Sequence, residues 1–319
     1  MKRKRFVLAC VAALLLTSCG NAAATSSVTR APNSSSAHAT AARPGLWRYT
    51  VRSGGRTRTY LLYVPHGYTA KHPLPLVLVF HGITDTALGT TTMNDLLAVD
   101  KRRNNMLLAY MQGYENSWND TAGHTPAEVA HVNDVAFTVA ALRQIESVYA
   151  VDRRRVVDTG FSNGALASEL FGCRIAAYLT LLVPVEGQMP TSVSPGCRPA
   201  APISVFEIHG TADQVIPYDG GTFTAYGGST TVLAAPASAA RWATLDGCRS
   251  TIATVTTSTA TISGYTRCRG GVSVELESIQ GGDHQWPDAF GELIETLIAK
   301  MPTSRVAAGT TPPASVTRR

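Results

Sequence analysis

The segment that most restricts what this chain can fold into is Gly160–Gly164, which reads Gly-Phe-Ser-Asn-Gly. The β-branched run Arg155–Thr159 before it is typical of a short buried strand, and Ala165–Phe171 after it has the spacing of a helix. A G-x-S-x-G segment between a strand and a helix predicts a sharp turn that exposes the serine at the edge of a sheet. Ser162 is therefore the candidate nucleophile. The alternative is a chance match in a chain with many glycines and serines.

The N-terminus has the composition of an export signal. Lys2–Arg5 is basic, and Phe6–Leu16 is apolar but too short to span a membrane as an ordinary helix. Leu16-Thr17-Ser18-Cys19 resembles the lipobox of bacterial lipoproteins, so we expect residues 1–19 to be a lipoprotein signal and Cys19 to carry the lipid. A plain secretory signal with an incidental cysteine is the alternative. Either way the chain is expected to be exported, and to be anchored on the extracytoplasmic side of the membrane or secreted.

Composition also divides the rest of the chain. Residues 20–43 are mainly Ala, Ser and Thr and cannot offset their ordering entropy by burial, so a disordered spacer is expected there, and residues 302–319 are expected to form a disordered tail. Residues 44–301 are long enough for one catalytic domain. The net charge of +6 includes four positive charges in Lys2–Arg5, and no basic cluster interleaved with aromatics follows. Nucleic acid is therefore not an expected partner.

Alternating runs predict the strands and helices of residues 44–301. Trp47–Val51 and Thr57–Val64 are β-rich and flank Ser53-Gly54-Gly55, which predicts a hairpin. A helix is expected over Val132–Tyr149. Further buried strands are expected at Leu74–Phe80, Ile203–Ile208 and Val272–Ile279. Strands that alternate with helices favour an α/β fold with a mostly parallel central sheet, helices on both faces and an antiparallel N-terminal edge.

Four cysteines remain beyond the lipobox, at positions 173, 197, 248 and 268. An even number of cysteines in an exported chain indicates disulfides, for which three pairings are possible. Pairing of sequence neighbours, Cys173 with Cys197 and Cys248 with Cys268, is the simplest. The spacing fits no C-x-x-C metal pattern, so no metal is expected.

A serine nucleophile needs a base, and the base needs an acid that holds its tautomer. Asp213 follows the strand Ile203–Ile208, and His284 follows the strand Val272–Ile279, which gives the order Ser, Asp, His. Asp219 is the alternative acid. His81 and His209 also stand at strand ends, but each precedes a glycine and is interpreted as a structural hydrogen-bonding residue.

The reaction also needs donors for the oxyanion. The backbone N–H of Asn163, the residue after the nucleophile, is one candidate. The other is the N–H of Ile83 in the loop after Leu74–Phe80, where Gly82 allows close approach. Trp118 and Trp286 are candidates for a substrate pocket, with burial in the core as the alternative.

Six segments together resemble the polyhydroxybutyrate depolymerase and feruloyl esterase family. They are Phe80-His81-Gly82, Gly113-Tyr114 with Ser117-Trp118-Asn119, Asn133-Asp134-Val135-Ala136-Phe137, Gly160-Phe161-Ser162-Asn163-Gly164, His209-Gly210-Thr211-Ala212-Asp213, and Gly281-Gly282-Asp283-His284-Gln285-Trp286-Pro287. With the lipobox, the chain most resembles the actinobacterial LpqC-type esterase lipoproteins. The resemblance implies an α/β-hydrolase fold, no cofactor, a triad of Ser162, Asp213 and His284, and the two local disulfides.

The chain departs from this family at three positions. Ala165 replaces a frequent second glycine, Asp283 replaces a usual glycine beside the histidine, and Glu186 stands where a small residue is common. Asp283 could offer His284 a decoy carboxylate. The expected function is a lipid-anchored serine hydrolase of small or oligomeric carboxylic esters. A serine peptidase on the same fold and a catalytically silent surface-binding lipoprotein are the alternatives.

Overall fold

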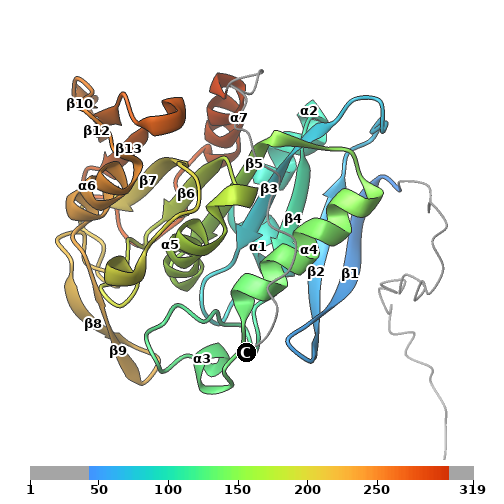
Figure 1. Ribbon diagram of the computed structural model, residues 1–319, viewed down its shortest axis with the longest axis horizontal. Coiled ribbons are helices and arrows are strands. Elements are labelled where there is room, and N and C mark those ends of the chain that lie inside the picture. The colour runs from blue at the N-terminus through green and yellow to red at the C-terminus, as the bar shows by residue number, and fades with distance from the viewer. Residues whose placement is uncertain (1–42, 302–319) are drawn as a thin grey trace, which may run out of the picture. The chain divides into compact units, whose positions relative to one another are not determined.

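The computed structural model describes residues 43–301, all of which fall in the compact unit Ala31–Arg319. The expected signal with Cys19, the spacer as far as residue 42 and the expected tail lie outside the described residues. The described chain forms a central sheet with helices on both faces (Figure 1). Among the helices of residues 43–301, none combines the length and the apolar composition that a membrane span requires.

The central sheet has eleven strands. Across the sheet they follow the order β1 (Gly45–Ser53), β2 (Arg56–Val64), β4 (Leu107–Met111), β3 (Leu74–Phe80), β5 (Val151–Phe161), β6 (Leu181–Val185), β7 (Ser204–Gly210), β13 (Val274–Ile279), β12 (Ala260–Thr266) and β10 (Ser250–Thr251), with β11 (Val255–Thr256) beside β12. The strands from β4 to β13 are parallel, and β1 and β2 form an antiparallel edge. The predicted sheet is confirmed.

The sequence did not predict a second antiparallel edge at the other end of the sheet. β12 pairs with β13, and β10 and β11 pair with β12. These strands lie in the Thr-rich segment between Cys248 and Cys268, where β-branched threonines suit a pleated, half-buried surface. Their pairing covers the edge of β13, which would otherwise be open to another chain.

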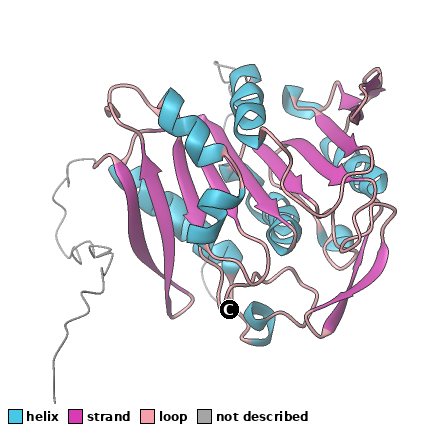
Figure 2. Ribbon diagram, turned by 180° about the vertical axis from the view of Figure 1, so that it is seen from behind, coloured by secondary structure: helices cyan, strands magenta, loops and turns pink. Residues whose placement is uncertain are grey.

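Helices cover the sheet on both faces (Figures 1 and 2). They are α1 (Ala87–Met93), α2 (Leu96–Arg103), α3 (Pro126–Val129), α4 (Asp134–Val148), α5 (Asn163–Ile175), α6 (Ala235–Asp246) and α7 (Phe290–Lys300), with 3-10 turns η1 (Ala176–Tyr178), η2 (Ser194–Gly196) and η3 (Arg269–Gly271). A separate hairpin, β8 (Gly221–Ala225) with β9 (Gly228–Val232), lies between β7 and α6. The predicted helix over 132–149 is α4, whose N-cap Asn133 accepts the N–H of Ala136 at 2.8 Å.

The core has two layers because successive side chains of a strand point to opposite faces. In β3, Leu76 and Leu78 pack in the cluster that contains residues of α4, α5 and α6. Val77 and Val79 pack in the cluster that contains residues of α1, α2 and α7. A strand buried on both faces must be apolar throughout, which explains the continuous apolar run of β3.

Two disulfides join the cysteines that are neighbours in sequence. Cys173 in α5 is bonded to Cys197, which follows η2. Cys248, just beyond α6, is bonded to Cys268, which precedes η3. The predicted local pairing is confirmed over its two alternatives.

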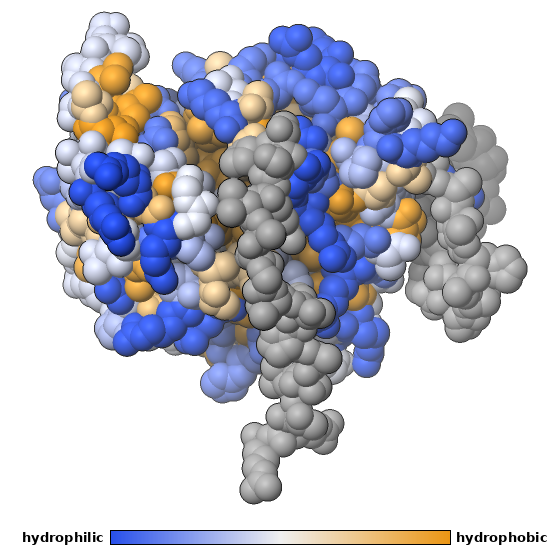
Figure 3. Space-filling model, turned by 45° about the horizontal axis from the view of Figure 1, so that its top comes forward, coloured by the Kyte–Doolittle hydropathy of each residue, from blue (hydrophilic) through white to orange (hydrophobic). Residues whose placement is uncertain are grey.

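On the face in Figure 3, apolar side chains form small patches between hydrophilic ones. Seven large hydrophobic residues are exposed in the described chain, and only Leu88 and Met93 share an element, α1. The other five are Val129, Val148, Val215, Tyr226 and Val255. Exposed apolar residues of this scattered kind are normal for a folded domain.

Candidate active site

Ser162 lies at the sharp turn between β5 and α5. Its φ is 56° and its ψ is −121°, a combination that residues other than glycine rarely adopt. The Ser162 N–H donates to the carbonyl of Val185 at 3.0 Å, and the Ser162 carbonyl accepts the N–H of Ala165 at 2.8 Å. The predicted strand, turn and helix are confirmed, and the unusual backbone angles belong to the serine itself.

The glycines that flank Ser162 are needed for close contact rather than for their backbone angles. A Cβ on Gly160 would collide with the backbone of Gly164. A Cβ on Gly164 would lie 2.6 Å from the carbonyl oxygen of His81. The start of α5 is therefore pressed against the end of β3, where the loop with Gly82 begins.

Asp213 and His284 meet beyond the ends of two neighbouring parallel strands, β7 and β13. His284 Nδ1 lies 2.7 Å from Asp213 Oδ2. The other oxygen, Asp213 Oδ1, accepts the N–H groups of Val215 and Ile216 at 2.6 and 2.9 Å. The backbone thus fixes the carboxylate so that one oxygen faces the imidazole.

Asp219, the alternative acid, is exposed. Within residues 43–301 it forms no hydrogen bond with a histidine, whereas Asp213 contacts both His284 and His209. Asp283, the possible decoy, accepts the backbone N–H of His284 at 2.8 Å and has no hydrogen bond to the imidazole among the described residues.

The electrostatics of Asp213 favour the ionised form. Burial by itself would raise its pKa, but hydrogen bonds from His209 and His284 and from the Val215 N–H, together with the charge of His284, outweigh burial. They hold the pKa of Asp213 well below its usual range. The carboxylate is therefore held in its charged form at pH values above its lowered pKa.

Phe161 directly precedes Ser162, and its ring contacts the imidazole of His284. Its ring lies 4.8 Å from the His284 ring and stacks on Trp286 at 5.3 Å, measured between centroids. His284 is 13% exposed at its side chain, and Ser162 is 8% exposed. No hydrogen bond joins Ser162 Oγ to His284 in the described chain. Such contacts are often long in a protein without substrate and tighten when substrate binds.

Two backbone N–H groups near Ser162 are free to donate. Within residues 43–301, the N–H of Ile83 and the N–H of Asn163 have no acceptor. Asn163 is the first residue of α5, where helical N–H groups lack intrahelical partners. A Cβ on Gly82 would lie 3.6 Å from Ser162 Cβ, so the Ile83 loop is adjacent to the serine.

The two tryptophans differ in their surroundings. Trp118 has no exposed surface, and its Nε1–H donates to the His81 carbonyl at 2.8 Å. It therefore belongs to the core, and its predicted place in a substrate pocket is wrong. Trp286 is 9% exposed, stacks on Phe161 and stands two residues after His284, so it stays a candidate for the pocket.

Sequence reasoning missed several polar contacts around these residues. The Asn163 side chain accepts the Trp118 N–H at 2.8 Å and donates to Asp120 Oδ2 at 2.7 Å. Burial, followed by the charge of Glu128, raises the pKa of Asp120 to about 7. No local pattern marks Asp120, because its contact with Asn163 joins residues that are 43 apart in sequence.

No protein-family model matches the sequence. The chain is 29% identical over 238 residues to feruloyl esterase B of Piromyces equi. The aligned region covers 71% of this chain and 42% of that protein. It is 29% identical over 169 residues to probable feruloyl esterase C of Aspergillus niger, and this aligned region covers 51% of this chain and 58% of that protein. The chain thus spans about half the length of these two relatives.

Solved structures with a similar backbone show which fold this chain has. An acetyl xylan esterase from Aspergillus awamori matches with a TM-score of 0.54 and 12% identity over 78% of this chain and 97% of that one. A ferulic acid esterase from Anaeromyces mucronatus matches with a TM-score of 0.51 and 17% identity over 81% of this chain and 90% of that one. These findings identify the chain as an α/β-hydrolase-fold protein that is related in sequence to esterases.

Proposed function

We propose that this protein is a serine hydrolase of carboxylic esters, with Ser162 as nucleophile, His284 as base and Asp213 as the acid that orients His284. The observation that carries the proposal is the Asp213–His284 contact of 2.7 Å at the sheet edge where Ser162 occupies its strained turn. The relatives named feruloyl esterase support an ester as the substrate.

The reaction follows from the roles of these groups. Ser162 Oγ attacks the ester carbonyl carbon while His284 Nε2 takes the hydroxyl proton. The N–H groups of Ile83 and Asn163 donate to the oxyanion of the tetrahedral intermediate. His284 then returns the proton to the departing alkoxide, which leaves as the alcohol. Water attacks the acyl-enzyme by the same proton transfers and releases the acid.

Asp213 contributes by holding the Nδ1–H of His284, so that Nε2 presents its lone pair to the serine. Its ionised state also stabilises the imidazolium that forms during the attack. No step in this scheme draws on a metal or an organic cofactor.

Ser162→Ala tests the proposal. We expect hydrolysis of p-nitrophenyl acetate to fall by several orders of magnitude, about 10⁴-fold or more, because the nucleophile is removed. The control is Ser147→Ala, an exposed serine of α4, which should leave the rate unchanged. A Ser162→Ala protein with the wild-type rate would disprove the assignment. A panel of methyl ferulate, p-nitrophenyl esters and hydroxybutyrate oligomers would then rank the substrates.

We also propose that the chain is exported and held to the membrane by a lipid on Cys19. The two disulfides support an oxidising compartment, and a diacylglycerol anchor supplies the two acyl chains that stable attachment requires. Cys19→Ala should leave the membrane fraction or remain unprocessed, whereas Cys10→Ala, within the same signal, should fractionate as wild type. An unchanged mass and membrane fraction for Cys19→Ala would refute the anchor.

A further inference from the structure

A buried glutamate stands beside the proposed acid, and the mechanism above does not use it. Glu186 directly follows β6, has no exposed surface and has a φ of 50°, which residues other than glycine rarely adopt. Its N–H donates to the Ile208 carbonyl at 2.9 Å. Both of its carboxyl oxygens accept the N–H of Gly210, each at 3.0 Å. Two contacts with β7 thus fix its position.

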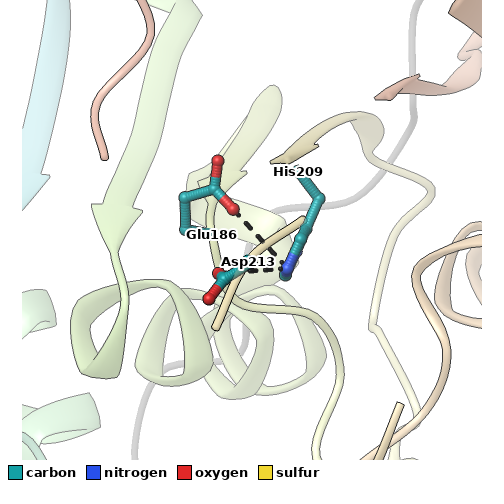
Figure 4. A group of neighbouring side chains, drawn as sticks. All are labelled: Glu186, His209 and Asp213. Carbon is teal, nitrogen blue, oxygen red and sulfur yellow. Dashed lines mark ion pairs between the residues drawn. The ribbon is translucent and has the colours of Figure 1, made fainter. Parts of the chain in front are cut away.

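Figure 4 shows Glu186, His209 and Asp213 turned toward one another. His209 Nε2 lies 3.5 Å from Glu186 Oε2 and 3.3 Å from Asp213 Oδ2, and the facing atoms of all three lie within 4.8 Å of one another. His209 Nε2 is also 2.9 Å from the carbonyl of Ile216, a contact that requires a proton on this nitrogen. A protonated nitrogen has no lone pair for a metal, so His209 cannot bind a metal through this nitrogen and the group is interpreted as a cluster of polar contacts.

The surroundings of the two carboxyl groups decide which one holds a proton. Asp213 accepts two backbone N–H groups and faces two histidines, which favours its charged form. Burial, with the hydrogen bond to Asp213 and the charges of Asp213 and Asp283, raises the pKa of Glu186 to about 9, although the Gly210 N–H opposes this shift. Two buried carboxylates this close would repel each other, so one proton is shared by the pair.

We propose that Glu186 is a positioning residue for the catalytic acid: it keeps a proton and donates it in a hydrogen bond to the Asp213 carboxylate, so that the pair presents a single negative charge to His284. This inference rests on the proposed triad. The titratable groups that face Glu186 are His209 on β7, Asp213 after β7 and Asp283 after β13. A second negative charge beside His284 would hold a proton on its imidazole and prevent it from acting as a base near neutral pH.

Glu186→Gln tests the charge state. The amide has the shape of a neutral carboxyl group, can accept from Gly210 and can donate to Asp213. We expect the wild-type kcat and an unchanged acid limb in the pH profile of kcat/KM. If Glu186 is ionised in the wild type, this substitution removes a negative charge and moves the acid limb to lower pH by about one pH unit or more. That movement would overturn the proposal.

Glu186→Ala tests the positioning role. Loss of the donor should lower kcat about 10- to 100-fold with little change in KM, because a misplacement of about 1 Å can reduce the rate by about 100-fold. The matched control is Glu207→Gln, another buried glutamate, whose Oε1 accepts the Ser238 hydroxyl at 2.7 Å. Its kcat and pH profile should equal those of the wild type. A Glu186→Ala protein with wild-type kcat would overturn the positioning role.

A second measurement does not depend on activity. In protein with ¹³C-labelled glutamate carboxyl groups, the NMR signal that Glu186→Gln removes should titrate near pH 9 rather than near the ordinary value of 4.5. Titration near 4.5 would disprove the shared proton. If the wild type cleaves no ester but this signal titrates near pH 9, the proposed function fails and the shared proton stands. If the wild type is active and Glu186→Ala equals it, the positioning role fails and the proposed function stands.

Discussion

At Ser162 the backbone is held in a conformation that an L residue disfavours, with a φ of 56°. Angles of this kind disfavour the folded state by about 1–3 kcal/mol and persist where surrounding contacts impose them. Here the contacts are the Ser162 hydrogen bonds to Val185 and Ala165. Glu186, at the end of the neighbouring strand, has a φ of 50°. Two such residues at adjacent strand ends fit a site where geometry is favoured over local stability.

The choice of acid can be tested residue by residue. Asp213→Asn should lower kcat about 10⁴-fold, because an amide in place of the carboxylate no longer holds the tautomer of His284. Asp219→Asn should have a kcat close to that of the wild type, since Asp219 is exposed. Steady-state kinetics with p-nitrophenyl acetate on both purified variants would decide, and the reverse order of kcat would transfer the role to Asp219.

At the scale of elements, the start of α5, the loop after β3 and the loop at Trp118 form one packed unit. The Asn163 side chain binds the Trp118 backbone, and Trp118 Nε1–H donates to the His81 carbonyl. The Trp118 ring packs edge-on against Phe80 with a centroid distance of 5.1 Å. The two proposed oxyanion donors, Ile83 and Asn163, are therefore held relative to each other by buried contacts rather than by mobile loops.

This unit leaves no room for a larger residue at the helix start. Gly164→Ala would push a methyl group against the His81 carbonyl, 2.6 Å away, and force the helix and the loop apart. We expect a loss of about 1–3 kcal/mol in stability, with a fall in kcat because the oxyanion donors separate. Gly196→Ala is the control, since a Cβ there meets nothing within 4 Å. Equal thermal melting temperatures for the two variants would contradict the packing argument.

For the whole molecule, several carboxyl groups lie in the core away from the site. Burial raises the pKa of Asp158 and of Glu207 to about 8 each. In the unfolded chain such groups ionise near about pH 4, so between pH 4 and 8 the unfolded state binds fewer protons than the folded state. Their contribution to stability is therefore complete below about pH 4 and is lost as the pH rises through about 8. The contribution of Asp213 to stability depends on pH with the opposite sign. Because the pKa of Asp213 is lowered in the folded protein, its carboxylate stabilises the fold above the unfolded-state pKa, and this contribution is lost as the pH falls.

Asp158→Asn should flatten this dependence, because the amide does not titrate. We expect the urea midpoint of the wild type to fall between pH 5 and pH 8 by more than that of Asp158→Asn. Asp219→Asn, a change at an exposed aspartate, should follow the wild type. Parallel curves for wild type and Asp158→Asn would show that Asp158 is ionised in the folded protein.

Features that depend on neighbours along the chain can be predicted from the amino-acid sequence. The turn at Ser162 follows from a strand, two glycines and a helix that are contiguous between Arg155 and Phe171. The alternation of apolar runs was enough to predict the parallel sheet and its N-terminal edge. The two disulfides also depend on neighbours along the chain, because they join cysteines that are 24 and 20 residues apart, respectively.

Contacts that depend on which strands lie side by side become apparent in the folded molecule and could not be predicted from the sequence. Glu186 reaches Asp213 because β6 and β7 are neighbours, and Asp213 reaches His284 because β13 is the next strand. Trp118 is buried because the His81 loop and Asn163 enclose it, although its sequence context suits a pocket as well as a core. The edge strand β12 forms because β13 offers it a partner, and β12 in turn pairs with β10 and β11. Strand order fixes each of these contacts, and the local periodicity of a sequence does not specify strand order.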